Sequence, residues 1–194
     1  MEIVTARSIY SFIRAGFLTF IIAVITGCSS LTLISDYDAE TDKQLTALQQ
    51  FTDAFVSKML AEIPKWDKGK KSAKNAYDSQ KTFYREFDNK LRLLEFRVQS
   101  IRKNSKTQKL VSYIRDAVLL RDEHEKQCEE EGLVIKDGEE TKYTSLQSLH
   151  CLKDNKAQGP SRLSLEINQR NINQVIGAAL ALEVAKKQGV ESNK

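Results

Sequence analysis

Five side chains in this sequence have the chemistry to bind a metal ion, form a disulfide or accept a covalent modification: three cysteines and two histidines. His124 and Cys128 are four residues apart and share one face of a predicted helix, while His150 and Cys151 are adjacent. Two histidines and two cysteines make a complete tetrahedral zinc set. Adjacent residues are poorly spaced to bind one ion, however, and the overall spacing matches no familiar zinc motif. We therefore predict no metal site and keep these four residues as an alternative only.

Catalytic motifs are missing from the sequence. It contains no Gly-x-Ser-x-Gly turn for a nucleophilic serine, no glycine-rich phosphate loop and no Glu-x-x-His pair for a di-iron centre. We expect a protein that is not an enzyme and needs no cofactor. Four aromatic residues at helical spacing, Tyr77, Phe83, Tyr84 and Phe87, are candidates to line a ligand pocket between helices. Such a stripe is more typical of a hydrophobic core, which is the interpretation we favour.

The first 28 residues have the pattern of an export signal. Arg7 and Arg14 precede an uncharged apolar run at residues 17–25, which is too short to span a bilayer but suits a signal peptide. The run leads into Ile25-Thr26-Gly27-Cys28, an aliphatic residue, two small residues and a cysteine. An uncleaved membrane anchor with an incidental Cys28 is the alternative.

The four residues ending at Cys28 resemble the lipobox of bacterial lipoproteins. The resemblance implies cleavage after Gly27, a diacylglycerol thioether on the Cys28 sulfur and an acyl chain, such as palmitate, on the new amino terminus. Two or more chains anchor a protein stably in a membrane. Ser29 then implies transfer to the outer membrane, facing the periplasm, with surface exposure left open. Residues 35–42 also resemble the start of small proteobacterial lipoproteins of uncharacterised function.

Once Cys28 is lipidated, Cys128 and Cys151 are the remaining thiols. The compartment outside the inner membrane is oxidising, and two cysteines in an exported domain usually pair. We predict a disulfide between them. It would close a loop of 24 residues and join the end of the third helix to the irregular segment that follows.

Hydrophobic periodicity and the scarcity of glycine and proline predict an all-α fold. We expect an antiparallel bundle of three or four long helices with an irregular insertion before the last helix. The expected helices span about 36–63, 70–103, 105–128 and 161–187, with Ser35 and Ser105 in capping signatures. Residues 133–144 are either a β-hairpin turning at Asp-Gly or a disordered loop, and residues 145–152 form a helical turn. The predicted domains are a signal at 1–27, a lipidated tether at 28–35 and a helical domain at 36–194, of which 129–160 is the insertion.

The charge of the mature chain argues against nucleic acid as a partner. Residues 28–194 contain 28 basic and 25 acidic side chains, a net charge of only +3. Lysines cluster between Lys65 and Lys74, either as a solvated turn, which we favour, or near anionic headgroups. By elimination we predict an envelope lipoprotein that acts through protein contacts as a structural, accessory or assembly factor. The alternatives are a carrier of a lipid or other apolar ligand and, third, a metal-binding stress protein.

Overall fold

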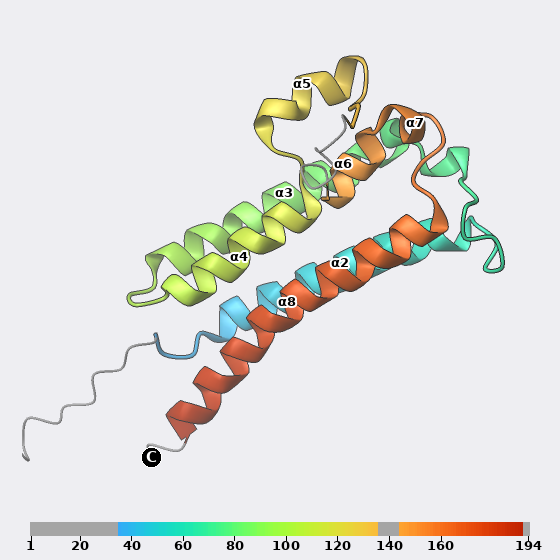
Figure 1. The fold of residues 1–194 in the computed structure, drawn as a ribbon. Coiled ribbons are helices and arrows are strands. Elements are labelled where there is room, and N and C mark those ends of the chain that lie inside the picture. The colour runs from blue at the N-terminus through green and yellow to red at the C-terminus, as the bar shows by residue number, and fades with distance from the viewer. Residues whose placement is uncertain (1–34, 136–143, 192–194) are drawn as a thin grey trace, which may run out of the picture. The chain divides into compact units, whose positions relative to one another are not determined.

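The structure, a computed structural model, describes residues 35–135 and 144–191 (Figure 1). The signal at 1–27, Cys28 and Ser29 lie outside the described residues, as does the Asp137–Gly138 turn of the alternative hairpin. The predictions made for those positions therefore stay predictions.

The described part of the chain is all-α, as the sequence predicted. In chain order its helices are α2 (Ala39–Ala61), the 3-10 helix η1 (Ala73–Asn75), α3 (Tyr77–Ser100), α4 (Ser105–Val118), α5 (Asp122–Glu130), α6 (Leu146–Cys151), α7 (Lys153–Lys156) and α8 (Arg162–Glu191). Helix α2 packs against α3 and α8, and α4 packs against the same two helices. Neighbouring helices of this bundle run antiparallel (Figure 1). None of the described helices is both long and apolar enough to cross a bilayer.

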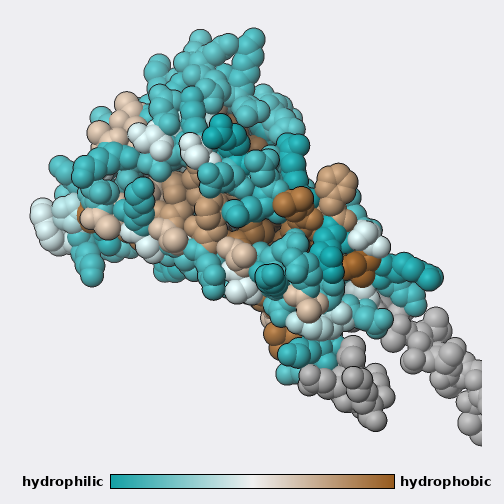
Figure 2. Space-filling view, turned by 180° about the vertical axis from the view of Figure 1, so that it is seen from behind, coloured by the Kyte–Doolittle hydropathy of each residue, from teal (hydrophilic) through white to brown (hydrophobic). Residues whose placement is uncertain are grey.

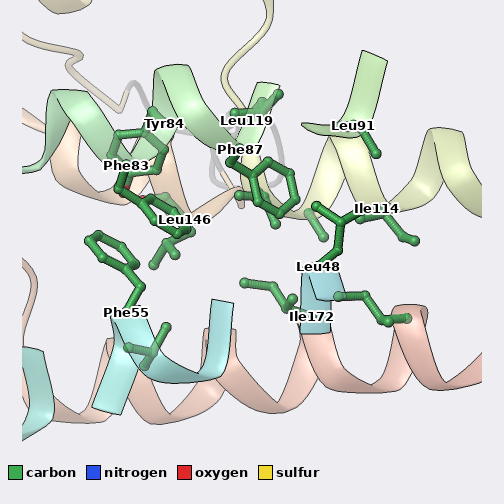
Figure 3. Packing of buried hydrophobic residues seen from close by; sticks show 14 of the residues in the cluster. Leu48, Phe55, Phe83, Tyr84, Phe87, Leu91, Ile114, Leu119, Leu146 and Ile172 are labelled. Carbon is green, nitrogen blue, oxygen red and sulfur yellow. The ribbon is translucent and has the colours of Figure 1, made fainter. Parts of the chain in front are cut away.

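The core lies where the four bundle helices face one another (Figure 3). On α3 the apolar residues that recur at three- and four-residue steps are buried, among them Tyr77, Tyr84, Phe87, Leu91, Leu94 and Val98. On α2 the apolar residues Leu45, Leu48, Phe55 and Met59 follow the same spacing and are buried, and Ile63 is buried just beyond the helix. The spacing of apolar residues therefore identified the inward faces of these two helices correctly.

Helix α2 begins later than the capping signature at Ser35 predicted. Asp38 is the N-cap, and its carboxylate accepts a hydrogen bond from the Thr41 backbone N–H at 2.9 Å. The Ser35 hydroxyl instead donates to Asn104 Oδ1 at 2.8 Å, in the turn between α3 and α4. A contact made 69 residues away thus decides the role of Ser35.

The helix that the sequence predicted at 70–103 is α3 in the structure, and it is shorter than predicted at both ends. It begins at Tyr77 because Asn75 turns inward and its side-chain amide donates to Met59 O at 3.0 Å, at the end of α2. Gly159, with a φ of +72°, packs so closely on Asn75 that a Cβ there would lie 2.5 Å from the Asn75 Cβ. The helix ends at Ser100, since Ile101 is extended and Lys103 has a φ of +58°.

The predicted helix 105–128 is two helices. Its first turn is preceded by Asn104 as N-cap, so Ser105 is the first helical residue and not the cap. The chain leaves the helix at Leu119, which is extended and buried, and α5 begins at Asp122. The Gln147 side-chain carbonyl accepts a hydrogen bond from Leu120 N–H at 2.9 Å. This bond satisfies a backbone donor at the point where the helix is interrupted.

The segment before α8 is irregular, as predicted, but contains two short helices. One of them, α6, is the helical turn expected at 145–152, and its N-cap Ser145 accepts from Ser148 N–H at 3.1 Å. Leu133 forms an isolated parallel bridge with Leu152. Helix α8 follows and extends to Glu191, past the expected end at Lys187.

Candidate functional site

The two cysteines of the domain lie at disulfide-bonding distance, as the sequence predicted. Cys128 on α5 and Cys151 at the end of α6 are joined, with their Cα atoms 5.2 Å apart, and both side chains are buried. Gly132 has a φ of +84°, and a Cβ at this position would lie 3.0 Å from Cys151 O. The glycine therefore permits the close backbone approach beside the disulfide.

The alternative zinc set is not assembled in this structure, because the disulfide uses both sulfur atoms. His150 points into the core, whereas His124 is half-buried on α5, with its Nε2 atom 3.4 Å from Glu123. Within residues 35–135 and 144–191 no cluster of three or more histidine, cysteine or acidic side chains is placed to hold a metal ion. Cys28, the lipidation candidate, is outside these residues.

His150 is fully buried beside the disulfide. Its Nδ1 atom lies 2.5 Å from the Tyr84 hydroxyl and 3.1 Å from Leu146 O, whereas Nε2 has no hydrogen-bond partner among the described residues. Burial lowers the pKa of His150 to about 4 and outweighs the Leu146 carbonyl, which acts in the opposite direction. The imidazole is therefore neutral at physiological pH. It is enclosed by the core.

The aromatic residues considered as a pocket lining divide into two groups. Phe83 stacks on Phe55 of α2 with ring centroids 3.5 Å apart, and Phe87 packs beside Phe83 (Figure 3). Tyr77 and Tyr84 reach the floor of a groove of about 330 Å³ whose rim includes Lys81, Arg85 and Glu129. The phenylalanines therefore belong to the core, as we favoured, while the tyrosines border a groove with a charged rim.

A larger groove, of about 600 Å³, runs between α3 and the segment from α4 to α5. Phe96 of α3 lines it and is 75% exposed, and Leu93, one turn earlier, is 67% exposed. Arg115, in the groove wall, donates two hydrogen bonds to Glu95 at 2.8 Å and one to Asp88 at 2.9 Å. Its charge is thus neutralised within the molecule.

Acidic side chains dominate the remaining charge of this groove. Asp116, Asp122 and Glu123 line it together with Arg121 and Arg92. Arg92 pairs with Asp88 at 2.8 Å, so it adds little free positive charge. The α3–α4 groove, as we call it, therefore combines an exposed phenylalanine with a mildly acidic rim.

Leu93 and Phe96 were not predicted from the sequence as surface residues, although a signal for them was available. Both residues are apolar but lie outside the three- and four-residue steps that bury Leu91, Leu94 and Val98. Large apolar residues off the buried face of a helix are candidates for a contact surface. Figure 2 shows that, on one face of the molecule, hydrophobic residues form patches between hydrophilic ones.

A buried polar network around the Glu183–Lys186 ion pair of α8 joins this helix to Asn104 and Thr107, at the start of α4. Lys186 Nζ lies 2.7 Å from Glu183 Oε1 and 2.8 Å from both Asn104 Oδ1 and Thr107 Oγ1. Both charged side chains are almost completely buried. Asn104 Oδ1 also accepts the Ser35 hydroxyl, so the network lies where the chain enters the domain. Nothing in the sequence indicates this network, since Glu183 and Lys186 resemble surface charges of a helix.

Comparison of the chain with models of protein families, with curated proteins and with solved structures found no match.

Proposed function

We propose that this chain is a lipoprotein of the bacterial cell envelope, anchored through acyl chains on Cys28 and facing the periplasm, with an outer-membrane location implied by Ser29. Its helical domain acts as a structural, accessory or assembly factor by binding another protein. The α3–α4 groove supports this proposal, because exposed Phe96 lines it and exposed Leu93 lies three residues earlier on α3, while the bundle beneath is filled by the core.

The partner that suits this groove is a helical segment with apolar residues flanked by lysine or arginine. Leu93 and Phe96 are three residues apart and so form one continuous apolar strip on α3. A partner helix can cover such a strip with residues one turn apart. Asp116 and Asp122, on the groove wall, favour basic flanking residues. Aromatic side chains at the centre of a groove commonly dominate the binding energy of an interface.

Site-specific photocrosslinking tests the protein contact. A crosslinking amino acid at position 96 of the full chain, expressed in cells, should capture one partner, whereas the same group at exposed Glu86 on the same helix should not. The purified partner should then bind Leu93→Ser/Phe96→Ser at least about tenfold more weakly than the wild-type chain. The control Glu86→Ser/Asn89→Ser changes two exposed polar residues of α3 and should bind normally. Equal capture at positions 96 and 86, or unchanged affinity of the serine pair, would contradict the proposal.

The anchor is tested separately. Mass spectrometry of the protein isolated from membranes should show an amino terminus at Cys28 bearing diacylglycerol and a further acyl chain. Cys28→Ala should retain residues 1–27 and carry no acyl chain. A wild-type chain that begins at Met1 and carries no lipid would refute the anchor but leave the groove experiment meaningful.

A further inference from the structure

A second surface lies at the end of the bundle where α2 stops and α8 begins. Leu163 N–H donates to Lys68 O at 3.0 Å, and Arg162 N–H donates to Lys70 O at 3.1 Å, which fixes the loop 64–72 against α8. Lys71 Nζ donates to Asp154 O at 3.0 Å. The same lysine lines a depression together with Val134 and Ile135. These three segments therefore form one continuous surface, which we call the lysine end.

The lysine end exposes an unusual amount of apolar side chain. Trp66, the single tryptophan of the chain, is 84% exposed at the loop. Among the described residues, the lysine end holds five of the nine exposed large hydrophobic side chains: Trp66, Val134, Ile135, Leu163 and Ile167. Tryptophan is enriched at membrane–water interfaces, because its ring is apolar while its indole N–H can still reach water or headgroups.

The same end has a concentrated positive charge. Residues 65–74 contain five lysines and one aspartate, a net charge of +4, which exceeds the +3 of residues 28–194 as a whole. Lys68 pairs with Glu166 and Lys74 with Glu62 at 2.8 Å, while Asp67 accepts a hydrogen bond from the Lys70 backbone N–H at 3.1 Å. Lys65, Lys70 and Lys71 have no carboxylate partner within the described part of the chain.

We propose that the lysine end binds the surface of an anionic phospholipid bilayer, with Trp66 in the headgroup region and the lysines against the phosphates. Lysines near an anionic membrane surface add attraction that salt screens within a Debye length. Exposed apolar side chains among them add a contribution that salt does not screen. This combination distinguishes a lipid surface from a soluble polyanion, which would use the lysines but leave the apolar residues in water.

The lysine end lies far from the place where the chain enters the domain. Ser35 precedes the first turn of α2, and the loop 64–72 follows its last turn (Figure 1). A helix of 23 residues is about 34 Å long. The lysine end therefore lies about one helix length from Ser35. The contact proposed for it does not depend on the function proposed above.

The fluorescence of Trp66 tests this proposal directly, because no other tryptophan contributes. We expect the purified full chain, mixed with vesicles of phosphatidylcholine and phosphatidylglycerol, to show an emission shift to shorter wavelength and reduced quenching by acrylamide. Pure phosphatidylcholine vesicles should leave the emission unchanged, even where residues 17–25 insert, since Trp66 reports only its own surroundings. Raising the salt concentration from 0.1 to 1 M shortens the Debye length from about 10 to about 3 Å and should weaken the response.

Two charge-matched variants make the test specific. Lys65→Glu/Lys70→Glu should bind anionic vesicles at least about tenfold more weakly. Lys43→Glu/Lys106→Glu lowers the net charge equally at exposed positions of α2 and α4 and should bind as the wild-type chain does. No emission shift with anionic vesicles, or an equal loss in both variants, would overturn the proposal. The same shift with soluble polyphosphate would also overturn it, in favour of a polyanion site.

Discussion

Among single side chains, His150 shows how the fold changes the protonation of a residue. It combines complete burial, a hydrogen bond to the Tyr84 hydroxyl and a neighbouring disulfide in a region without water access. Burial stabilises the neutral imidazole, so the folded chain binds a proton at His150 only near pH 4, unless the local packing opens. The residue therefore links the stability of the domain to pH.

The free energy of unfolding should fall by about 3 kcal/mol when the pH is lowered from 6.5 to 4. The unfolded chain binds a proton at His150 near pH 6.5, whereas the folded chain binds it only near pH 4. Between these values the unfolded state holds more protons, so acid favours unfolding. Urea unfolding monitored by circular dichroism at a series of pH values measures this slope.

Two histidine variants separate this effect from general acid sensitivity. His150→Gln removes the titrating group, so its stability, although lower at neutral pH, should change little between pH 6.5 and 4. His124→Gln retains His150, so its free energy of unfolding should decrease between pH 6.5 and 4 as that of the wild type does. If the His150→Gln chain lost as much stability in this window as the wild type, the assignment would be wrong.

Among the helices, α5 depends most on a covalent link. It packs on α6, to which the Cys128–Cys151 disulfide joins it, and Cys128 is its only buried side chain. Lys81 of α3 adds a salt bridge to Glu129 at 2.6 Å, on a partly exposed surface where such pairs contribute little. The disulfide is therefore the main constraint that keeps α5 beside the two grooves.

Replacing both cysteines, Cys128→Ser/Cys151→Ser, should lower the free energy of unfolding by about 3 kcal/mol, because a loop of 24 residues is no longer closed. Hydrogen exchange should accelerate first in α5, while α2, α3 and α8 keep their protection. Mass-resolved exchange on the full chain measures both effects. Reduction of the wild-type chain should reproduce them, and the double variant should not respond to reductant. Unchanged exchange in α5 after reduction would show that other contacts hold this helix.

The sequence predicted the helices correctly where buried residues recur at regular spacing. It predicted helix ends wrongly where a contact with a residue far away in the chain determines them. Leu91, Leu94 and Val98 follow one face of α3, so their spacing alone identifies that face. The break after Val118 depends on Gln147, which is 27 residues from Leu120 and not recognisable in the local sequence. Similarly, Asp38 caps α2 while it also binds Arg97, 59 residues away. The exposed Phe96 has the same residue type as the buried Phe87, so hydrophobicity alone does not assign it to a surface.

For the domain as a whole, the four bundle helices share one core. Each of α2, α3, α4 and α8 contributes buried side chains to the same cluster. A core of this kind makes unfolding cooperative, since no helix of the bundle can leave without exposing the others. Damage to one buried position should therefore weaken all four helices together.

Adjacent leucines on α3 provide a matched test. Leu94 is completely buried and Leu93 is 67% exposed, so their truncation differs only in the packing that is lost. Leu94→Ala should cost about 3 kcal/mol of unfolding free energy, whereas Leu93→Ala should change it by less than about 0.5 kcal/mol. Urea titrations measured by circular dichroism and by hydrogen exchange should give coincident transitions. A large loss for Leu93→Ala would show that this residue is covered in solution.

The hydrogen bonds at Ser35 also determine how the domain resists mechanical tension. Ser35 N–H donates to Lys103 O at 3.1 Å, and its hydroxyl donates to Asn104, so the incoming chain is held by the turn between α3 and α4. Three residues later, Asp38 binds the Arg97 guanidinium of α3. A pulling force that arrives from the amino terminus therefore acts on these contacts before it reaches the first turn of α2. Contacts with α3 and with the turn after it therefore protect the first helix of the domain from unwinding under such a force.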